Sequence, residues 1–346
     1  MDSMPGFDSF SKRHPALTLI LTNVGLLLVI AIIFELILRL FIVNYNINFY
    51  TATKKEGVVK YQYGEIVTNS LGYADEEFDL SEIRPRIGYF GDSVNYGVGT
   101  GYPYRFSELV EVALPEYAHW NLSLGLGGSF ERKSTIHAAH EFEIQHVVYL
   151  LNLNDILPSS KDAGEKSVHT VKRIVKYFDG LRGRSYLYNY LRYKAKNALQ
   201  LNGFEASGYR AYEFWPQKNQ AVFEEFSTRV NDTFNALAAD NISFCVVLLP
   251  YEMQISNEAE QIYNEMGFTW ENGFIEGSPQ SLLRKLLEFS HVYDPMTEFD
   301  RNAAEIGEYF VYNLGDKIDW NHPNRKGHAI ISEGFLKSSA CPFLNP

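Results

Sequence analysis

The sequence predicts an α/β domain, in which a mainly parallel five-stranded sheet lies between two layers of helices, together with one N-terminal transmembrane helix. Two observations predict this architecture. From residue 86 onward, short apolar runs alternate with helix-length stretches, which is typical of parallel strands joined by helical crossovers. Before them, residues 16–34 contain no charged side chain, and about 20 such residues are enough to cross a bilayer as a helix.

The N-terminal apolar segment is expected to be an uncleaved membrane anchor over residues 16–43, after a tail at 1–15. Its apolar stretch is too long for the h-region of a signal peptide and no small-x-small cleavage site follows, so an anchor is favoured over a cleaved signal peptide. A buried core helix is less favoured at this position in the chain. Glu35 and Arg39 fall where the helix should leave the hydrocarbon, and they can pair on one face or the arginine can reach the headgroups.

The charges around the anchor do not fix its orientation. Basic residues precede it and follow it, namely Lys12 and Arg13 before and Arg39, Lys54 and Lys55 after, whereas the positive-inside rule needs an asymmetry. Residues 44–85 are mixed and polar, with a turn at 69–72, and are expected to form a connector that packs on the domain.

Five strands and several helices are expected in the domain at 86–340. The strand candidates are 87–90, 119–124, 146–151, 242–249 and 291–293, and the helix candidates include 104–112, 131–143 and 220–238. The stretch at about 158–216 is too long for a simple connection. This insertion contains a tyrosine-rich, basic, helix-like section at 186–193. The insertion is interpreted either as a lid or substrate wall or as a packing excursion without substrate contact, and the residues do not decide between these.

The composition narrows the class of protein. The 346 residues are 46% hydrophobic and carry a formal net charge of -11, which argues against a nucleic-acid partner because phosphate binding needs a concentrated basic surface. The two cysteines, Cys245 and Cys341, are too few for a disulfide framework. Cys245 lies in an apolar run and is expected to pack as a small, free apolar side chain, with a single disulfide as the less favoured alternative.

Two segments suggest nucleophilic catalysis. Ser93 follows Gly91 and Asp92 directly after a predicted strand, and Asp319 and His322 lie three positions apart far along the chain. A serine needs a base to become a nucleophile, and the base needs an orienting partner. In parallel sheets ligands bind at the carboxyl ends of the strands, which is where Ser93 is predicted to lie.

Two further segments could supply hydrogen-bond donors. The glycine-rich stretch at 121–132 and the Asn152-Leu153-Asn154-Asp155 turn each follow a predicted strand. Glycines allow a backbone N–H to approach a ligand closely, and a side-chain amide can donate to a developing oxyanion. Taken alone, each segment is typical of a tight turn.

In this order the four segments resemble the catalytic blocks of the SGNH hydrolases, the GDSL esterase/lipase superfamily, over about residues 86–338. The resemblance implies the flavodoxin-like three-layer fold of that family. It also implies a triad of Ser93, His322 and Asp319, and an oxyanion hole made by Ser93, Gly127 and Asn154, with Gly125 and Gly128 as alternatives to Gly127.

The sequence departs from the family pattern at two positions. Asn152 stands where the third block has a glycine, and its side chain is expected to narrow the pocket or to shift Asn154. Residues 67–73 resemble an element that precedes the catalytic block in membrane-anchored bacterial members, with Ala74 in place of its usual arginine.

The function expected from the resemblance is a membrane-anchored serine ester hydrolase acting on acyl esters of a carbohydrate or a lipid. An O-acyltransferase that modifies a cell-surface polysaccharide and a catalytically idle anchored binding protein are the alternatives. No metal or organic cofactor is expected, and His137 and His140 are interpreted as surface helix residues rather than as a metal pair. The resemblance also implies a domain outside the cytoplasm, held at the inner membrane.

Overall fold

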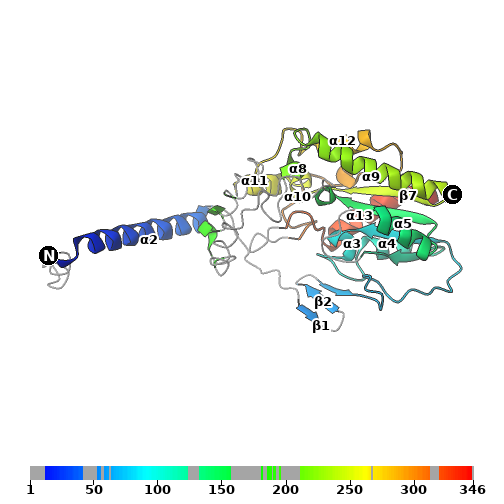
Figure 1. The fold of residues 1–346 in the computed structure, drawn as a ribbon, viewed down its shortest axis with the longest axis horizontal. Helices are drawn as coiled ribbons and strands as arrows, with labels where there is room; N and C mark the ends of the chain where they lie inside the picture. The colour runs from blue at the N-terminus through cyan, green and yellow to red at the C-terminus, as the bar shows by residue number, and fades with distance from the viewer. Residues whose placement is uncertain are drawn as a thin grey trace.

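The computed structural model describes most of the chain in several ranges. These are residues 12–41, 53–55, 58–61, 64–123, 132–156, 181, 185–188, 190–191, 195, 211–265, 268–311 and 319–344. Helix α2 (Pro15–Phe41) projects from one end of an α/β domain, and the C-terminus lies at the opposite end of that domain (Figure 1).

The described residues form one five-stranded sheet with the order β5-β4-β6-β7-β8, in which every neighbouring pair is parallel. The strands are β4 (Arg86–Gly91), β5 (Ala118–Asn121), β6 (His146–Asn152), β7 (Ser243–Leu249) and β8 (Val292–Tyr293). The predicted fold class is therefore confirmed, although β5 ends three residues earlier than expected. The chain forms β5 on one side of β4 and then crosses to form β6 on the other. This places a topological switch point, where open α/β sheets bind ligands, at the carboxyl ends of β4 and β6.

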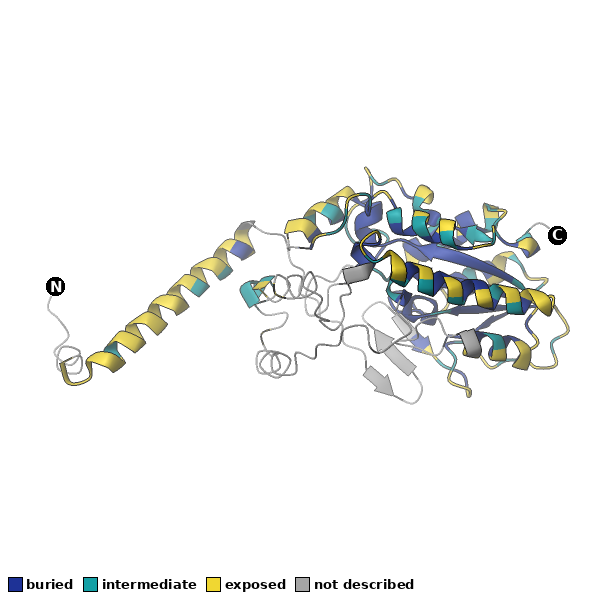
Figure 2. Cartoon of the chain, turned by 45° about the horizontal axis from the view of Figure 1, so that its top comes forward, coloured by how far each residue is buried: buried dark blue, intermediate teal, exposed yellow. Residues whose placement is uncertain are grey.

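Alternate residues of the strands fill two separate cores, one on each face of the sheet. On one face Val148 and Val247 pack with α4 (Phe106–Ala113) and α13 (Arg325–Lys337). On the other face Val147 and Val246 pack with helices α5 (Arg132–Glu141), α9 (Gln220–Ala239) and α12 (Ser278–Leu286). The strands are dark blue between helices with exposed outer faces (Figure 2). Strands buried on both faces explain the unbroken apolar runs in the sequence.

The predicted helices are present with small differences at their ends. Other elements were not predicted, because they are only one to three turns long and carry little periodic signal. They are α3 (Ser93–Tyr96), η1 (Leu153–Asp155), α8 (Ala211–Phe214), α10 (Glu252–Ile255), α11 (Asn257–Glu265), α12 (Ser278–Leu286), η3 (Pro295–Glu298) and η4 (Pro342–Leu344).

The region expected as a connector contains a small antiparallel sheet that the polar composition did not indicate. Its strands are β1 (Thr53–Lys55), β2 (Val58–Tyr61) and β3 (Gly64–Val67). After the turn at 69–72, the ring of Phe78 stacks on Trp120 with 4.7 Å between centroids. The buried guanidinium of Arg105, which pairs with Glu108, donates to the carbonyl of Ala74. The expected domain boundaries themselves stay a prediction.

The expectation that Cys245 is a free cysteine is wrong, because it forms a disulfide with Cys341 at a Cα–Cα distance of 5.6 Å. The disulfide was the less favoured alternative because the two residues are 96 positions apart and no local pattern indicates that they meet. They meet since α13 and η4 return the C-terminal segment to the face of β7 that carries Cys245. The bond ties the end of the chain to a central strand.

Candidate active site

Ser93 lies at the switch point because of the residues just before it. Gly91 ends β4 with a φ of +157°, and a Cβ there would lie 2.8 Å from the carbonyl oxygen of Leu150 on β6. The neighbouring strand can approach so closely only because position 91 has no side chain. Asp92 then caps α3 by accepting a hydrogen bond from the amide of Val94 at 3.0 Å. Ser93 is the first residue of that helix, and only 8% of it is exposed.

The structure brings together the three side chains that the sequence predicted. Nε2 of His322 lies 2.7 Å from Oγ of Ser93, and Nδ1 of His322 lies 2.8 Å from each carboxylate oxygen of Asp319. A carboxylate only accepts, so Nδ1 carries the ring proton and Nε2 is left to accept from the serine hydroxyl. Oγ of Ser93 is also 3.2 Å from Oδ2 of Asp92. This carboxylate is a second acceptor for the hydroxyl proton, at a longer distance than Nε2 of His322.

The surroundings of His322 favour its protonated form. Burial acts to lower its pKa, but the charge of Asp319, the hydrogen bond to it and the charge of Asp92 outweigh burial, so the pKa lies above the ordinary value. A base with a raised pKa takes the hydroxyl proton more readily, and Asp319 stabilises the imidazolium that results.

The loop that carries His322 is held by residues that the sequence analysis did not single out. Asn324 caps α13 by accepting from the amides of Lys326 and Gly327. Its side-chain amide faces the carbonyls of Gly307, Glu308 and Phe310 at 2.9–3.1 Å. Asn324 follows a proline and directly precedes a helix, which was the available signal for the cap. Nothing in the sequence indicated the carbonyls, because they come from a segment that only the fold brings near.

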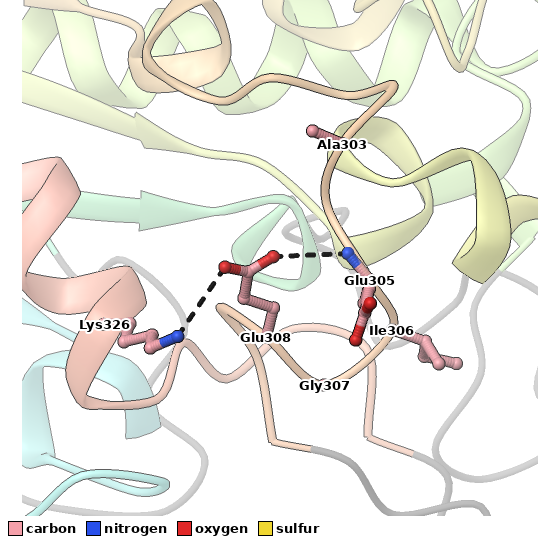
Figure 3. A pocket seen from close by; sticks show the side chains of 6 residues that line it. All are labelled: Ala303, Glu305, Ile306, Gly307, Glu308 and Lys326. Atoms are coloured by element: carbon pink, nitrogen blue, oxygen red, sulfur yellow. Dashed lines mark hydrogen bonds and ion pairs between the residues drawn. The ribbon is translucent and has the colours of Figure 1, made fainter.

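A pocket flanks this loop and does not include the predicted catalytic residues among its lining. Its wall consists of Ala303, Glu305, Ile306, Gly307, Glu308 and Lys326. The carboxylate of Glu308 spans it, accepting from the amide of Glu305 at 3.3 Å and pairing with Lys326 at 3.6 Å (Figure 3). These contacts reinforce the segment that Asn324 binds.

A buried carboxylate lies behind Asp319. The two oxygens of Glu252 accept from the hydroxyl of Tyr263 and from the amide of Gly307, each at 2.6 Å. The same hydroxyl lies 3.2 Å from the carbonyl of Asp319, and the amide of Glu252 donates to the carbonyl of Trp320 at 2.8 Å. Burial raises the pKa of Glu252 to about 7. The two hydrogen bonds act to lower this pKa, and the negative charge of Asp319 acts to raise it. Glu252 follows β7 at the carboxyl edge, which was the available signal for it.

The predicted oxyanion donors are only partly within the described residues. Gly127 and its alternatives at 125 and 128 lie outside them. Asn154 lies in η1, directly after β6, on the same edge of the sheet as Ser93 because β4 and β6 are neighbours.

The side chain of Asn152 connects two of the predicted segments. It is fully buried, it accepts from the amide of Asn154 at 3.4 Å, and it donates to the carbonyl of Asn321 at 3.3 Å. The side chain of Asn152 therefore holds the Asn154 turn against the residue before His322.

The interpretation of His137 and His140 as surface residues of a helix is confirmed. The side chain of His137 is 79% exposed and lies 3.6 Å from Glu141, and that of His140 is 48% exposed and lies 3.2 Å from Asp240. In the part of the chain that the structure describes, no group of three or more His, Cys, Asp or Glu residues is arranged to hold a metal ion.

No protein-family model matches the sequence, and no curated protein matches it. The chain is similar in structure to several solved proteins. One is a protein described as lipolytic, of the G-D-S-L family, from Desulfitobacterium hafniense, with 11% identity, a TM-score of 0.36 and coverage of 73% of this chain and 98% of that chain. An acetylxylan esterase from Geobacillus stearothermophilus has 11% identity, a TM-score of 0.34 and coverage of 73% and 93%.

A salicylyl-acyltransferase from a tetracycline biosynthetic pathway has 15% identity and a TM-score of 0.32, and the match covers 77% of this chain and 56% of that chain. Likenesses at these identities and TM-scores carry no argument about activity. What the chain does therefore has to be argued from its own residues.

Proposed function

We propose that the chain is a membrane-anchored serine ester hydrolase of the SGNH type. The observation that carries the proposal is the hydrogen-bonded row in which Ser93 Oγ lies 2.7 Å from His322 Nε2 and His322 Nδ1 lies 2.8 Å from Asp319. Nucleophile, base and orienting carboxylate are already within the distances that proton transfer needs. An anchored binding protein without activity would not require this geometry.

The reaction follows from these contacts. Ser93 Oγ attacks the ester carbonyl carbon while its proton passes to Nε2 of His322. His322 then gives the proton to the departing alcohol as the bond between acyl carbon and alcohol oxygen breaks, which leaves the acyl group on Ser93. In the second step, water attacks the acyl carbon and loses a proton to His322. The bond between the acyl carbon and Ser93 Oγ then breaks, the acid leaves, and His322 returns the proton to Ser93 Oγ.

The negative oxygen formed in each step needs donors at the switch point. The amide of Ser93, the amide of Gly127 and the side chain of Asn154 are proposed for this role, and losing one such donor typically lowers turnover by about 10²–10³. If a sugar hydroxyl replaces water in the second step, the same residues transfer the acyl group, so the O-acyltransferase alternative keeps the site unchanged.

The substrate class proposed is an acyl ester of a carbohydrate or lipid outside the cytoplasm. Disulfides persist in oxidising compartments and are rare in the cytosol, so the Cys245–Cys341 bond supports an extracytoplasmic domain. The candidate span at Pro15–Leu40 would hold that domain at the membrane.

The test is labelling of intact cells by a membrane-impermeant fluorophosphonate probe. The wild-type chain and the control Ser70→Ala, which changes an exposed serine, are expected to be labelled, whereas Ser93→Ala is not. Labelling of Ser93→Ala would overturn the assignment of the nucleophile, and labelling only after permeabilisation would overturn the topology. Turnover of a chromogenic acetyl ester, with and without an oligosaccharide acceptor, distinguishes hydrolysis from transfer.

A further inference from the structure

The last turns of the anchor helix are bonded to the insertion, about 150 residues further along the chain. Oε1 of Glu35 accepts from Nε of Arg39 at 2.7 Å and from the amide of Tyr186 at 3.0 Å. Oε2 of Glu35 accepts from the hydroxyl of Ser185 at 2.9 Å and from the amide of Leu187 at 2.8 Å. The guanidinium of Arg39 lies 4.6 Å from the ring centroid of Tyr186. One carboxylate therefore has four donors, three of them from the insertion.

The face of α2 that carries Glu35 is the less exposed one. Ala31, Glu35 and Leu38 are spaced four and three residues apart, which puts them on one side of the helix. Ala31 and Glu35 are half-buried, and Leu38 is only 7% exposed. The apolar side chains of the preceding turns are exposed, as the yellow helix in Figure 2 shows. The contact is thus confined to the C-terminal end of the helix.

The position of Glu35 along the helix sets the depth of this contact. The uncharged stretch at 16–34 has 19 residues, and at about 1.5 Å per residue it is ~28 Å long, close to the ~30 Å hydrocarbon core of a bilayer. Glu35 is the next residue, so it lies at the boundary between hydrocarbon and headgroups. Ser185, Tyr186 and Leu187 are hydrogen-bonded to it and lie at the same depth.

The side chains around this contact suit that depth. We define the tyrosine segment as the described residues between 181 and 191, namely Leu181, residues 185–188, Tyr190 and Leu191. Tyr186 and Tyr190 are half-buried, and a tyrosine ring has one apolar and one polar end, which favours the membrane–water interface. Leu181 and Leu191 are 42% and 55% exposed, and apolar side chains exposed at this depth face acyl chains rather than water.

We propose that the tyrosine segment is a membrane-interface element, which rests in the headgroup region of the lipid bilayer beside the point where the anchor leaves it. Its partner is the bilayer itself, and Glu35 is the residue that holds the segment there. The alternative, in which the segment binds only protein, is an outcome of the test below.

This placement has a consequence for the substrate, which rests on the proposed function. The insertion begins directly after η1, the turn that carries Asn154. The chain therefore runs from the edge of the sheet that carries Ser93 to an element on the membrane surface. An ester or acceptor that is itself held at the membrane surface fits this arrangement better than a freely diffusing one.

The test uses the full chain in phosphatidylcholine vesicles, with an environment-sensitive fluorophore on Leu191→Cys and nitroxide quenchers on lipid headgroups or deep in the acyl chains. A blue shift and loss of fluorescence with headgroup quenchers are expected at position 191. The matched control is Val112→Cys on α4, which is 82% exposed and is expected to show neither change. Equal quenching at both positions would overturn the proposal.

A second variant examines the role of Glu35. Glu35→Gln removes the charge that holds Arg39 and leaves one oxygen for the three donors of the insertion, so quenching at position 191 is expected to fall. Unchanged quenching in this variant would overturn the role given to Glu35. All measurements are repeated with Ser93→Ala, because membrane contact at 191 does not depend on the nucleophile. Failure of this proposal and failure of the proposed function are thereby distinguished.

Discussion

Single residues around Ser93 work through backbone contacts as much as through side-chain chemistry. Gly91 lets β6 approach, Asp92 fixes the first turn of α3, and Gly99, with a φ of +99°, lets the following loop lie against the segment of His322. A Cβ at Gly99 would lie 2.9 Å from the carbonyl of Pro323 and 3.3 Å from the Cβ of His322. The serine and the histidine are thus brought together by two glycines from the same β4–α3 region.

Asp319→Asn is expected to lower kcat by up to about 10⁴, because the imidazole loses the acceptor that fixes its tautomer. The charge and hydrogen bond of Asp319 also raise the pKa of His322 above its ordinary value. Activity needs the neutral ring and falls as pH drops through this pKa, so the acid limb of kcat/KM should move to lower pH in the variant. Ester hydrolysis measured across pH checks this, with the exposed Asp232→Asn as control. An unmoved acid limb would contradict it.

Glu252→Gln is expected to change how stability depends on pH. The pKa of Glu252 is about 7 when folded, against an ordinary value of 4.5. A carboxyl that binds its proton more tightly when folded lowers the free energy of unfolding as pH rises from about 4.5 to about 7. At about 1.4 kcal/mol for each pKa unit, the effect is at most about 3.5 kcal/mol.

Denaturant unfolding at a series of pH values measures the slope of the unfolding free energy against pH. This slope should be shallower in Glu252→Gln. Burial also raises the pKa of Asp75 to about 7, so some slope remains in the variant. Because Glu252 contacts the Asp319 loop through Tyr263, kcat should fall as well, with KM nearly unchanged. A slope equal to that of the wild type would contradict the assignment.

At the scale of secondary-structure elements, α13 connects the site to the rest of the domain. Its N-terminal cap, Asn324, holds the loop of His322, and its apolar face packs against the sheet beside the disulfide. Packing of the helix in the core therefore also fixes the position of His322, the proposed general base.

Replacing Asn324 separates the two roles of its side chain. Asn324→Ala loses both the cap and the contacts with three carbonyls, and a lost cap alone costs about 1 kcal/mol. Asn324→Asp keeps the acceptor for the helix amides but cannot donate to the carbonyls. Both variants are expected to lower kcat, and only the alanine variant should lose the stability of the cap. An alanine variant with the unfolding free energy of the wild type would show that the cap contributes nothing.

Removing the disulfide by replacing Cys245 and Cys341 with alanine is expected to destabilise the domain by about 4–5 kcal/mol, the value for a loop of ~100 residues. The reason is that the bond closes a loop of 96 positions, which limits the unfolded chain. Unfolding midpoints measured with and without reductant check this. If reductant lowers the midpoint of the alanine variant as much as that of the wild type, the loss does not come from this bond.

At the scale of the whole molecule, the sequence predicted the features that depend on local pattern. The strands were recognisable as short, mainly apolar runs, of which β4 to β7 are buried on both faces. Ser93 was recognisable because it follows a strand end, and Asp319 and His322 because they stand three apart. The contacts of Asn152 with Asn321 and of Glu252 with Tyr263 were not predictable, since each joins segments that meet only in the folded chain. The same holds for the Cys245–Cys341 bond.

The full-length chain is expected to remain in the membrane fraction after alkaline extraction with residues 1–41 still attached. Residues 16–34 are long enough to span a bilayer, and a cleaved signal peptide would leave a chain without α2. Intact-mass measurement of the protein extracted from membranes checks this. A mature N-terminus beyond residue 41 would contradict the anchor.

The bond between Glu35 and the insertion also bears on how the protein is made. Glu35 leaves the ribosome 150 residues before Ser185, the first of the insertion groups that bond to it. During that interval Arg39, four residues away on the same helix, is already present as a partner for the carboxylate. The contact between this helix and the insertion can therefore form only after more than half of the polypeptide has been synthesised.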